Sequence, residues 1–490
     1  MRPLKYITIF HKKIQERNNR LKNITYKNVP LTDEILFKQE QNIRRNIPYF
    51  IQIGFDFGTA FSKCIYRDVN LDKAYIYLNS ENPDVPFLIP STLFSQEDKL
   101  YSSDDLSVVY NQGSLNHLKL ALVKIAHEEW DDRVLISYKK ILNSFNKSAI
   151  TSKDKLREFV INCGIYYLAK NLGNIRKQIK TKYHNFGEHP KDYIAVNLSV
   201  PVTYNRQGDI EDLFIKLLKR AWLLTDQIVE IPKISYQDLN YLILHFDQDS
   251  NGEACFIFPE VSANVQGFVR SRVSRPGIYL LTDTGAGTVD QSIFIFIRSD
   301  GQDLLVYLHA DIFPLGSSYI EYLAAQSDAS TDLNKMEFWR KKKEEGDREP
   351  ILFKVQKIIR DELLDKTTSC LAHAKKKLIV KEQLNDIRLI FSGGGHCNYP
   401  YEKAVVQSFG GCMFKERITP DIVGMPKPRD LELGIGNNSW LPRLNVAYGL
   451  SFERHNLAVF KYPQDTKDVK PEEIWQPKKQ TFESPTKDEC

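Results

Sequence analysis

Residues 53–59 read IGFDFGT, residues 280–290 read LLTDTGAGTVD, and residues 389–395 read LIFSGGG. Each segment is an apolar, strand-like run that stops in a turn of Gly with Asp, Thr or Ser. Glycine lets the main chain approach another group closely, so backbone N–H groups in such turns can bind phosphate oxygens. The first two turns also carry Asp56 and Asp283, and carboxylates are the ligands that a hydrated Mg²⁺ prefers. Together the three segments predict an ATP site.

The length of 490 residues exceeds what one hydrophobic core usually organises, so two lobes are expected. With 42% hydrophobic and 26% charged residues, the composition is that of an ordinary soluble protein. The charge is unevenly distributed, because residues 1–45 hold 11 Lys and Arg against 4 Asp and Glu, a net charge of +7. The whole chain carries +5, so the remaining residues carry a net charge of −2. The basic character is therefore confined to the N-terminal segment.

The N-terminal segment has no apolar run long enough for a signal peptide, and the chain has no stretch of 18 apolar residues that would predict a membrane span. Seven cysteines occur singly, at positions 64, 163, 255, 370, 397, 412 and 490, without a CxxC pair. This spacing favours neither a zinc knuckle nor a disulfide framework. A reducing cytoplasm is the expected location.

The pattern along the chain predicts two similar α/β halves, each with strand hairpins followed by helix, strand and helix. Helical spacing covers residues 115–126, 153–182, 210–224 and 352–377, and strands are predicted at 49–57, 193–200, 291–297 and 387–391. The charged stretch 335–349 is interpreted as a solvated helix or loop. The predicted parts are a basic N-terminal extension (1–45), lobe I (46–275), lobe II (276–462) and a disordered, Pro-rich and charged tail (463–490).

The motifs and their order resemble the ATPase superfamily of actin, sugar kinases and the 70-kDa heat-shock chaperones, and most of all the chaperone ATPase domain. Residues 53–59 resemble that family's first phosphate loop, IGIDLGTT, and residues 283–290 its second, DLGGGTFD. Further segments match in the same order, over about residues 46–460: 198–205 (LSVPVTYN), 259–263 (PEVSA), 313–317 (FPLGS), 392–395 (SGGG) and 445–449 (NVAYG). The resemblance implies an actin-like α/β ATPase fold, with two lobes built on mixed sheets and flanking helices, and ATP or ADP in the cleft between them.

The resemblance also implies a role for individual residues. Gly58 and Thr59 would hold phosphates from one side of the cleft. Asp56 and Asp283 would bind Mg²⁺ through its waters, and Glu260 would help to orient water. Lys119, 63 residues after Asp56, lies about where the family has a lysine near the γ-phosphate; the alternative is a surface lysine on an amphipathic helix. The implied nucleotide contacts of the second half are Gly285, Ala286, Gly287, Thr288, Gly316, Ser317, Gly393, Gly394 and Gly395.

Two departures from the family bear on function. Ala286 replaces the middle Gly of the second phosphate loop, and residues 395–398 (GHCN) lack the Arg that stacks on adenine in the chaperones. A third expectation concerns the residues after the ATPase body, which number about 30 and are too few for the family's peptide-binding domain. We therefore expect a chain that does not bind unfolded peptides as those chaperones do.

The predicted function is a slow, Mg²⁺-dependent hydrolysis of ATP to ADP and phosphate, in which opening and closing of the cleft controls a separate partner. Three alternatives remain: a nucleotide-gated scaffold without turnover, a small-molecule kinase, and a filament-forming relative of actin. Partner contacts are expected in residues 1–45 or 463–490, which lie outside the family's core. The basic segment is also of a kind that attracts nucleic acid or acidic lipid, although it contains no nucleic-acid motif and is equally consistent with an extension that packs on the body.

Overall fold

The computed structural model describes residues 47–79, 85–103, 113–146, 152–201, 207–245, 254–271, 274–299, 302–329, 335–395, 399–410, 418–434 and 440–466. Residues 1–48 and 187–192 form one compact unit, and residues 49–186 and 193–490 form a second. The predicted basic extension lies outside the described residues. The predicted tail does too, except for residues 463–466, which include the 3-10 turn η6 (Pro463–Asp465). The architecture below is that of the second unit.

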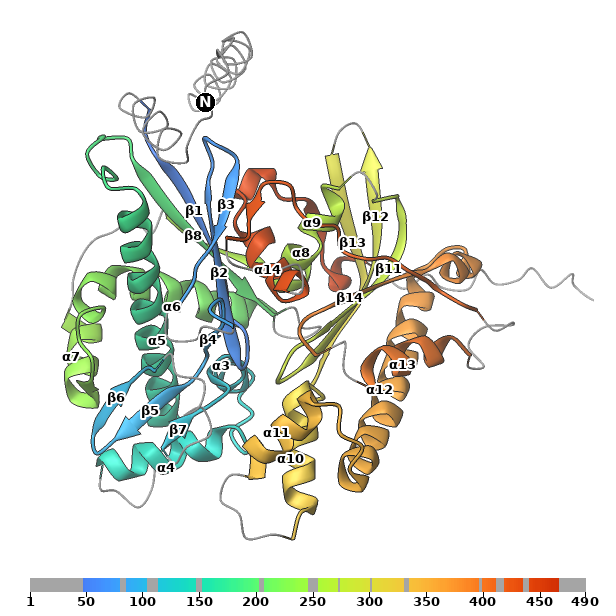
Figure 1. Cartoon of the computed structure of the whole chain (residues 1–490), viewed down its shortest axis with the longest axis horizontal. Helices are drawn as coiled ribbons and strands as arrows, with labels where there is room; N and C mark the ends of the chain where they lie inside the picture. The colour runs from blue at the N-terminus through green and yellow to red at the C-terminus, as the bar shows by residue number, and fades with distance from the viewer. Residues whose placement is uncertain are drawn as a thin grey trace, which may run out of the picture. The chain divides into compact units, whose positions relative to one another are not determined.

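The second unit has a mixed α/β architecture with two large sheets (Figure 1). In sheet order, the strands of the first sheet are β10 (Cys255–Pro259), β8 (Tyr193–Val200), β1 (Phe50–Asp56), β2 (Phe61–Asp68), β3 (Lys73–Ile76) and β16 (Leu431–Glu432), with β4 (Ile89–Pro90) paired to β2. The strands of the second sheet are β15 (Asp421–Ile422), β14 (Arg388–Ser392), β11 (Gly277–Thr284), β12 (Val289–Ser299), β13 (Gln302–Phe313) and β17 (Val459–Lys461). A smaller sheet contains β7 (Ser114–Leu115), β5 (Leu93–Gln96), β6 (Lys99–Tyr101) and β9 (Ile234–Ser235).

Both large sheets repeat one pattern of connections. In the first, β1 pairs antiparallel with β2 and parallel with β8, and β8 pairs parallel with β10. In the second, β11 pairs antiparallel with β12 and parallel with β14, and β14 pairs parallel with β15. Each parallel step needs a crossover, which a helix supplies. The two halves therefore share a topology, as the order of predicted elements indicated.

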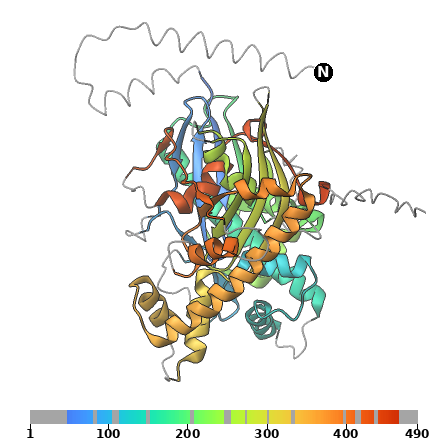
Figure 2. The ribbon, with the colours of Figure 1, turned by 90° about the vertical axis from the view of Figure 1, so that its right-hand side faces the viewer.

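Helices cover the outer face of each sheet and fill the space between the sheets. The helices are α3 (Leu118–Ala126), α4 (Leu135–Asn146), α5 (Lys153–Lys182), α6 (Gln207–Ile228), α7 (Tyr236–His245), α8 (Glu260–Asn264), α9 (Gln266–Val269), α10 (Ser317–Ser327), α11 (Lys335–Glu344), α12 (Pro350–Lys377), α13 (Tyr401–Gln407) and α14 (Leu441–Leu450), with 3-10 turns η2 (Lys381–Asp386), η3 (Ser408–Gly410) and η5 (Arg454–Asn456). One apolar core joins the first sheet to α3, α5 and α6, and another joins the second sheet to α10, α12 and α13. Figure 2 shows α12, in orange, running across the second sheet.

The helices α8, α9 and α14 pack between the two sheets (Figure 1). Glycine makes this close approach possible on the side of the first sheet. A Cβ atom on Gly54 of β1 would lie 2.3 Å from the carbonyl oxygen of Ala447 in α14. One on Gly449 would lie still closer to the backbone of α8. Because backbone atoms cannot move aside as a flexible side chain can, these two glycines fix how closely α14 packs.

The predictions of secondary structure are confirmed for the most regular elements. The helix α5 and the strand β8 span the predicted residues, and β1, β12, α12 and β14 agree with prediction within a few residues. The sequence analysis did not predict α4, α7, α10 or the long strand β13. No helix in the described part of the chain is long and apolar enough to cross a membrane. The proposed boundaries of the two lobes stay a prediction, and β16 and α14 of the C-terminal half pack on the first sheet.

Candidate functional site

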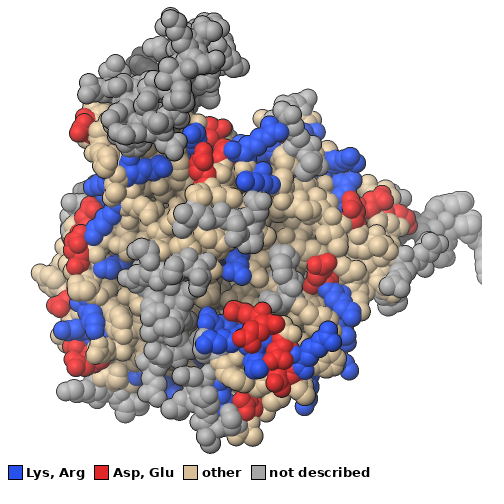
Figure 3. Space-filling model, viewed as in Figure 1, with Lys and Arg blue, Asp and Glu red and all other residues tan. Residues whose placement is uncertain are grey.

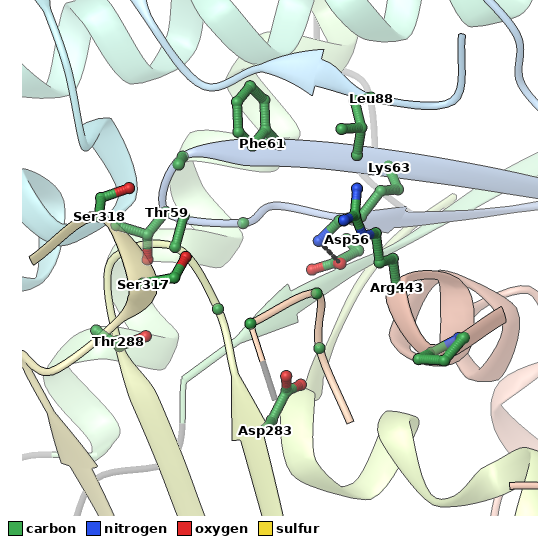
Figure 4. A pocket seen from close by; sticks show the side chains of 18 of the residues that line it. Asp56, Thr59, Phe61, Lys63, Leu88, Asp283, Thr288, Ser317, Ser318 and Arg443 are labelled. Atoms are coloured by element: carbon green, nitrogen blue, oxygen red, sulfur yellow. Dashed lines mark hydrogen bonds and ion pairs between the residues drawn. The ribbon is translucent and has the colours of Figure 1, made fainter. Parts of the chain in front are cut away.

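The two predicted Gly turns face each other across a cavity of about 890 Å³ (Figure 4). Residues from both turns, from the third Gly segment and from the start of α10 line it. Predicted site residues in the lining are Asp56, Gly58, Thr59, Glu260, Asp283, Gly285, Ala286, Thr288, Ser317, Gly393, Gly394 and Gly395. Segments more than 300 residues apart in the sequence thus form one site, as the sequence predicted.

Asp56 lies at the end of β1 and is almost fully buried, with an exposed fraction of 1%. Lys63 of the neighbouring strand β2 donates a hydrogen bond to Asp56 Oδ2 at 2.8 Å, which the dashed line in Figure 4 marks. Ser199 at the end of β8 donates to Asp56 Oδ1 at 3.4 Å and accepts the backbone N–H of Phe57 at 3.0 Å. The carboxylate is therefore held in place and its charge is balanced by one ammonium group.

Asp283 occupies the corresponding position at the end of β11, but its surroundings differ. Asn264 Nδ2 donates to Asp283 Oδ2 at 2.5 Å, and Ser392 donates to Asn264 Oδ1 at 2.9 Å. Gly393 follows with a φ of 80°, and a Cβ there would lie 2.3 Å from Asp283 Oδ1. Burial raises the pKa of Asp283 well above its usual range, and the nearby carboxylates of Glu260 and Asp290 raise it further.

The second Gly turn is held from two sides. A Cβ on Gly287 would lie 2.4 Å from Thr59 Cγ2, so the two turns come together here because residue 287 has no side chain. On the other side, the N–H groups of Ser317 and Ser318 donate to the carbonyl oxygens of Gly285 and Ala286, at 3.0 and 2.8 Å. The first N–H groups of α10 therefore position the turn, and Ser317 can reach a ligand only with its side chain.

Lys119 is not a surface lysine, because its exposed fraction is only 5%. Its ammonium forms an ion pair with Glu260 at the start of α8. Although burial disfavours the charged form, the attraction of Glu260, Asp56 and Asp290 raises the pKa of Lys119. Lys119 and Glu260 thus form one charged unit, of which Glu260 lines the cavity.

Several lining residues were missed by the sequence analysis. Lys63 and Asp290 lie on the second strands of the two hairpins, and Arg443 comes from α14. The interpretation of residues 335–349 as a solvated face is wrong for α11, because Arg340, Lys343 and Glu344 line the cavity. Lys343 is buried and forms an ion pair with the buried Glu321 of α10, while its Nζ also donates to Ser317 O at 3.2 Å. The helical spacing of 340, 343 and 344 on one face was a signal available in the sequence.

The residues of this cavity fit a divalent cation and a phosphorylated ligand. Four carboxylates face two ammonium groups around Asp283, which leaves two negative charges in excess: Asp56, Glu260, Asp283 and Asp290 against Lys63 and Lys119. Burial and Glu260 raise the pKa of Asp290 to about 7, as expected where carboxylates lack a nearby cation. Within the described residues, the buried atoms Thr284 Oγ1 and Asp290 Oδ1 have no hydrogen-bond partner. The volume falls within the roughly 300–1,000 Å³ of ligand pockets.

Comparisons with known proteins add no family to this geometry. No protein-family model matches the chain, and no curated protein matches it. The case for a function rests on the motifs and on the arrangement of the residues that they place around the cavity.

Proposed function

We propose that the protein binds Mg-ATP in this cavity and has the actin-like ATPase fold, as in the 70-kDa heat-shock chaperones. The observation that carries the proposal is the pair of strand–turn–strand units that place Asp56 and Asp283 on opposite sides of one cavity. The repeated topology of the two sheets supports it, because two similar halves around a central nucleotide are what that fold requires. A likeness of fold alone does not define an activity, so the residues must carry the argument.

In this proposal the two Gly turns bind the phosphates from opposite sides. Thr59 and Thr288 offer hydroxyl groups, and Gly58 and Gly285 allow the backbone to come close. Asp56 and Asp283 hold Mg²⁺ through water, and the excess negative charge around them provides the electrostatic attraction. Gly393, Gly394 and Gly395, together with Ser317 beside Gly316, face the nucleoside end. Bound Mg-ATP supplies the γ-phosphoryl group, which hydrolysis transfers to water to give ADP and phosphate.

The Glu260–Lys119 pair is proposed to act on the water and on the charge that develops during transfer. Glu260 lines the cavity and can accept a hydrogen bond from an attacking water, while the positive charge of Lys119 behind it compensates the negative charge of the transition state. These are positioning and electrostatic roles, which dominate phosphoryl transfer.

Calorimetric titration of the full chain with Mg-ATP tests the binding. We expect Asp283→Ala and Asp56→Ala each to weaken binding or slow hydrolysis at least about tenfold, because Mg²⁺ loses part of its negatively charged surroundings. Asp212→Ala, on the exposed face of α6, is the matched control and should leave both unchanged. Unchanged affinity together with unchanged turnover in both site variants would refute the proposal.

A second candidate is a nucleotide-gated scaffold that binds ATP without turning it over. It is favoured by one observation, namely that the ammonium of Lys119 is engaged by Glu260 instead of lining the cavity. A single-turnover assay separates the candidates. For an ATPase, Lys119→Ala should lower the rate more than the affinity. For a scaffold, the parent protein hydrolyses no ATP, and the variant changes affinity alone.

We further propose that closure of the cavity around nucleotide is passed to a protein partner through residues 1–45 or 463–490. The described part of the face in Figure 3 shows Lys and Arg interspersed with Asp and Glu, so the excess positive charge of the chain is concentrated in residues 1–45. Deletion of 1–45 should leave ATP binding intact, since every motif begins after Tyr49, but should abolish co-purification of a partner. A truncated protein that loses nucleotide binding would contradict this assignment.

A further inference from the structure

A second group of ligand-type side chains lies in the other half of the molecule, away from the Gly turns. His309 and Asp311 come from β13, and Cys370 comes from α12, which packs on that strand. An imidazole nitrogen, a carboxylate oxygen and the thiol sulfur of these three residues all lie within 4.8 Å of one another. His309 and Cys370 are buried, with exposed fractions of 8% and 1%, while Asp311 is exposed.

An irregularity in the sheet explains why these side chains meet. In the pairing of β12 with β13, Ile293 lies opposite His309 and Phe294 lies opposite Tyr307, so Leu308 has no partner. Such a bulge re-aims the side chains that follow it. Leu308 packs in the core shared with α12, and His309 and Asp311, two residues apart, lie on one face of the strand next to Cys370.

The chemistry of the three groups suits a metal better than it suits a packed core. Burial, with the neighbouring His373 and Lys377, lowers the pKa of His309 to about 4, so the imidazole is neutral and has a lone pair to donate. Cys370 has no disulfide partner, and Asp311 accepts the N–H of Ile312 at 2.8 Å, which orients its carboxylate. A thiolate and a carboxylate together carry two negative charges, which a divalent cation neutralises.

We propose that His309, Asp311 and Cys370 bind a zinc ion. Zn²⁺ accepts this mixture of nitrogen, oxygen and sulfur ligands in tetrahedral geometry, whereas Mg²⁺ and Ca²⁺ prefer oxygen alone. Water takes the fourth position. His373 is the nearest protein alternative, but its ring stacks on that of His309, with centroids 4.9 Å apart and planes 13° apart. The in-plane lone pairs of two parallel stacked rings do not converge on one ion, and His373 Nδ1 lies 2.9 Å from Ser369 O.

The position of this site in the chain gives it a consequence. Asp311 lies two residues before the end of β13, and the segment that follows leads into Gly316 and Ser317 beside the first cavity. A zinc ion would tie this end of β13 to α12 and so stiffen the support of that segment. The site itself rests on the geometry of β13 and α12, and it is independent of whether the first cavity binds ATP.

The experiment uses the full-length protein, stripped with a chelator and then titrated with Zn²⁺ against a competing indicator. We expect Asp311→Asn and Cys370→Ala each to bind one equivalent less, or to bind it at least about tenfold more weakly. Asp303→Asn, on the same strand but away from the cluster, and Cys163→Ala, another buried cysteine, are the matched controls. Because Asp311 is exposed, its variant keeps the test valid if Cys370→Ala does not fold.

Substitution with Co²⁺ identifies the sulfur ligand directly. A thiolate bound to Co²⁺ gives a charge-transfer absorption, which should be present in the parent protein and in Cys163→Ala and absent in Cys370→Ala. His373→Ala should retain the band and the zinc affinity, since that ring is not a ligand in the proposal. Zinc stoichiometry, affinity and Co²⁺ spectra that are the same in the parent, Asp311→Asn and Cys370→Ala would overturn it. So would a parent protein that takes up no zinc.

Discussion

The two hairpins that border the cavity differ at one pair of positions. In β1 and β2, Asp56 lies directly opposite Lys63, and in β11 and β12, Asp283 lies directly opposite Asp290. Both cross-strand partners are seven residues further along the chain. An opposite charge across a strand pair stabilises a sheet, whereas a like charge destabilises it. The same local motif therefore produces a neutralised carboxylate on one side of the cavity and a strained pair of carboxylates on the other.

This difference shows how the two halves divide the work in the proposed site. The first half brings lysines to the cavity region, namely Lys63 from β2 and Lys119 from α3, whereas the second half brings the unbalanced carboxylates. Stability in the absence of a ligand is expected to come mainly from the first hairpin. Affinity for a cation is expected to come mainly from the second.

The largest expected effect breaks the packing that is particular to the first hairpin. Gly54→Ala places a Cβ within 2.6 Å of three backbone atoms of α14, so we expect a loss of about 4 kcal/mol or more in the free energy of unfolding. Gly208→Ala is the matched control, because nothing lies within 4 Å of a Cβ at that position. Urea unfolding measures both variants. A Gly54→Ala protein as stable as Gly208→Ala would show that α14 can move away from β1.

A smaller effect tests the two cross-strand pairs directly. Lys63→Met leaves the buried Asp56 without its cation and should lower the free energy of unfolding by about 3 kcal/mol. Asp290→Asn removes one of two like charges, and we expect a gain of about 1 kcal/mol. Both are measured by urea unfolding without nucleotide or metal, and a loss of stability in both variants would contradict the comparison.

The gain from Asp290→Asn should also depend on pH. Because the pKa of Asp290 in the folded protein is raised to about 7, its ionised form destabilises the fold above that pH. Below the ordinary carboxylate pKa, the group is protonated in the folded and the unfolded protein alike. The gain should therefore be largest at about pH 8 and should shrink towards about pH 4.

The smallest effect concerns α3, the helix that delivers Lys119. His117 precedes this helix with a φ of 56°, and its buried Nδ1 has no hydrogen-bond partner among the described residues. Burial and Arg133 lower the pKa of His117 to about 4. Since the unfolded chain takes up a proton near pH 6.5 and the folded protein does not, stability should fall as the pH drops from 6.5 towards 4.

His117→Asn should remove about 1 kcal/mol of this acid destabilisation, because Asn tolerates a positive φ and does not titrate. The measurement is the free energy of unfolding at about pH 7 and about pH 5, with His245→Asn on α7 as an exposed control. An equal pH dependence in the parent and in His117→Asn would show that His117 is protonated in the folded state.

The sequence by itself determined the strand ends and the turns. Residue order alone is enough to predict them, because an apolar run that stops at Gly and Asp specifies a local structure. The long helix α5 was predictable for the same reason, since a single apolar stripe and the capping residue Ser152 define it locally. The grouping of Asp56, Thr59, Glu260 and Asp283 in one cavity followed from the order of motifs and the family that they resemble.

Only the tertiary structure decided what surrounds each of these groups. Lys63 and Asp290 occupy equivalent positions, and their opposite effects on the two carboxylates depend on which strands pair. The burial of Lys119 and Lys343 depends on elements distant in sequence, so a charge pattern read along one helix could not distinguish them from solvated lysines. The cluster of His309, Asp311 and Cys370 was likewise invisible to cysteine spacing, because a bulge in one strand and a turn of a distant helix bring its ligands together.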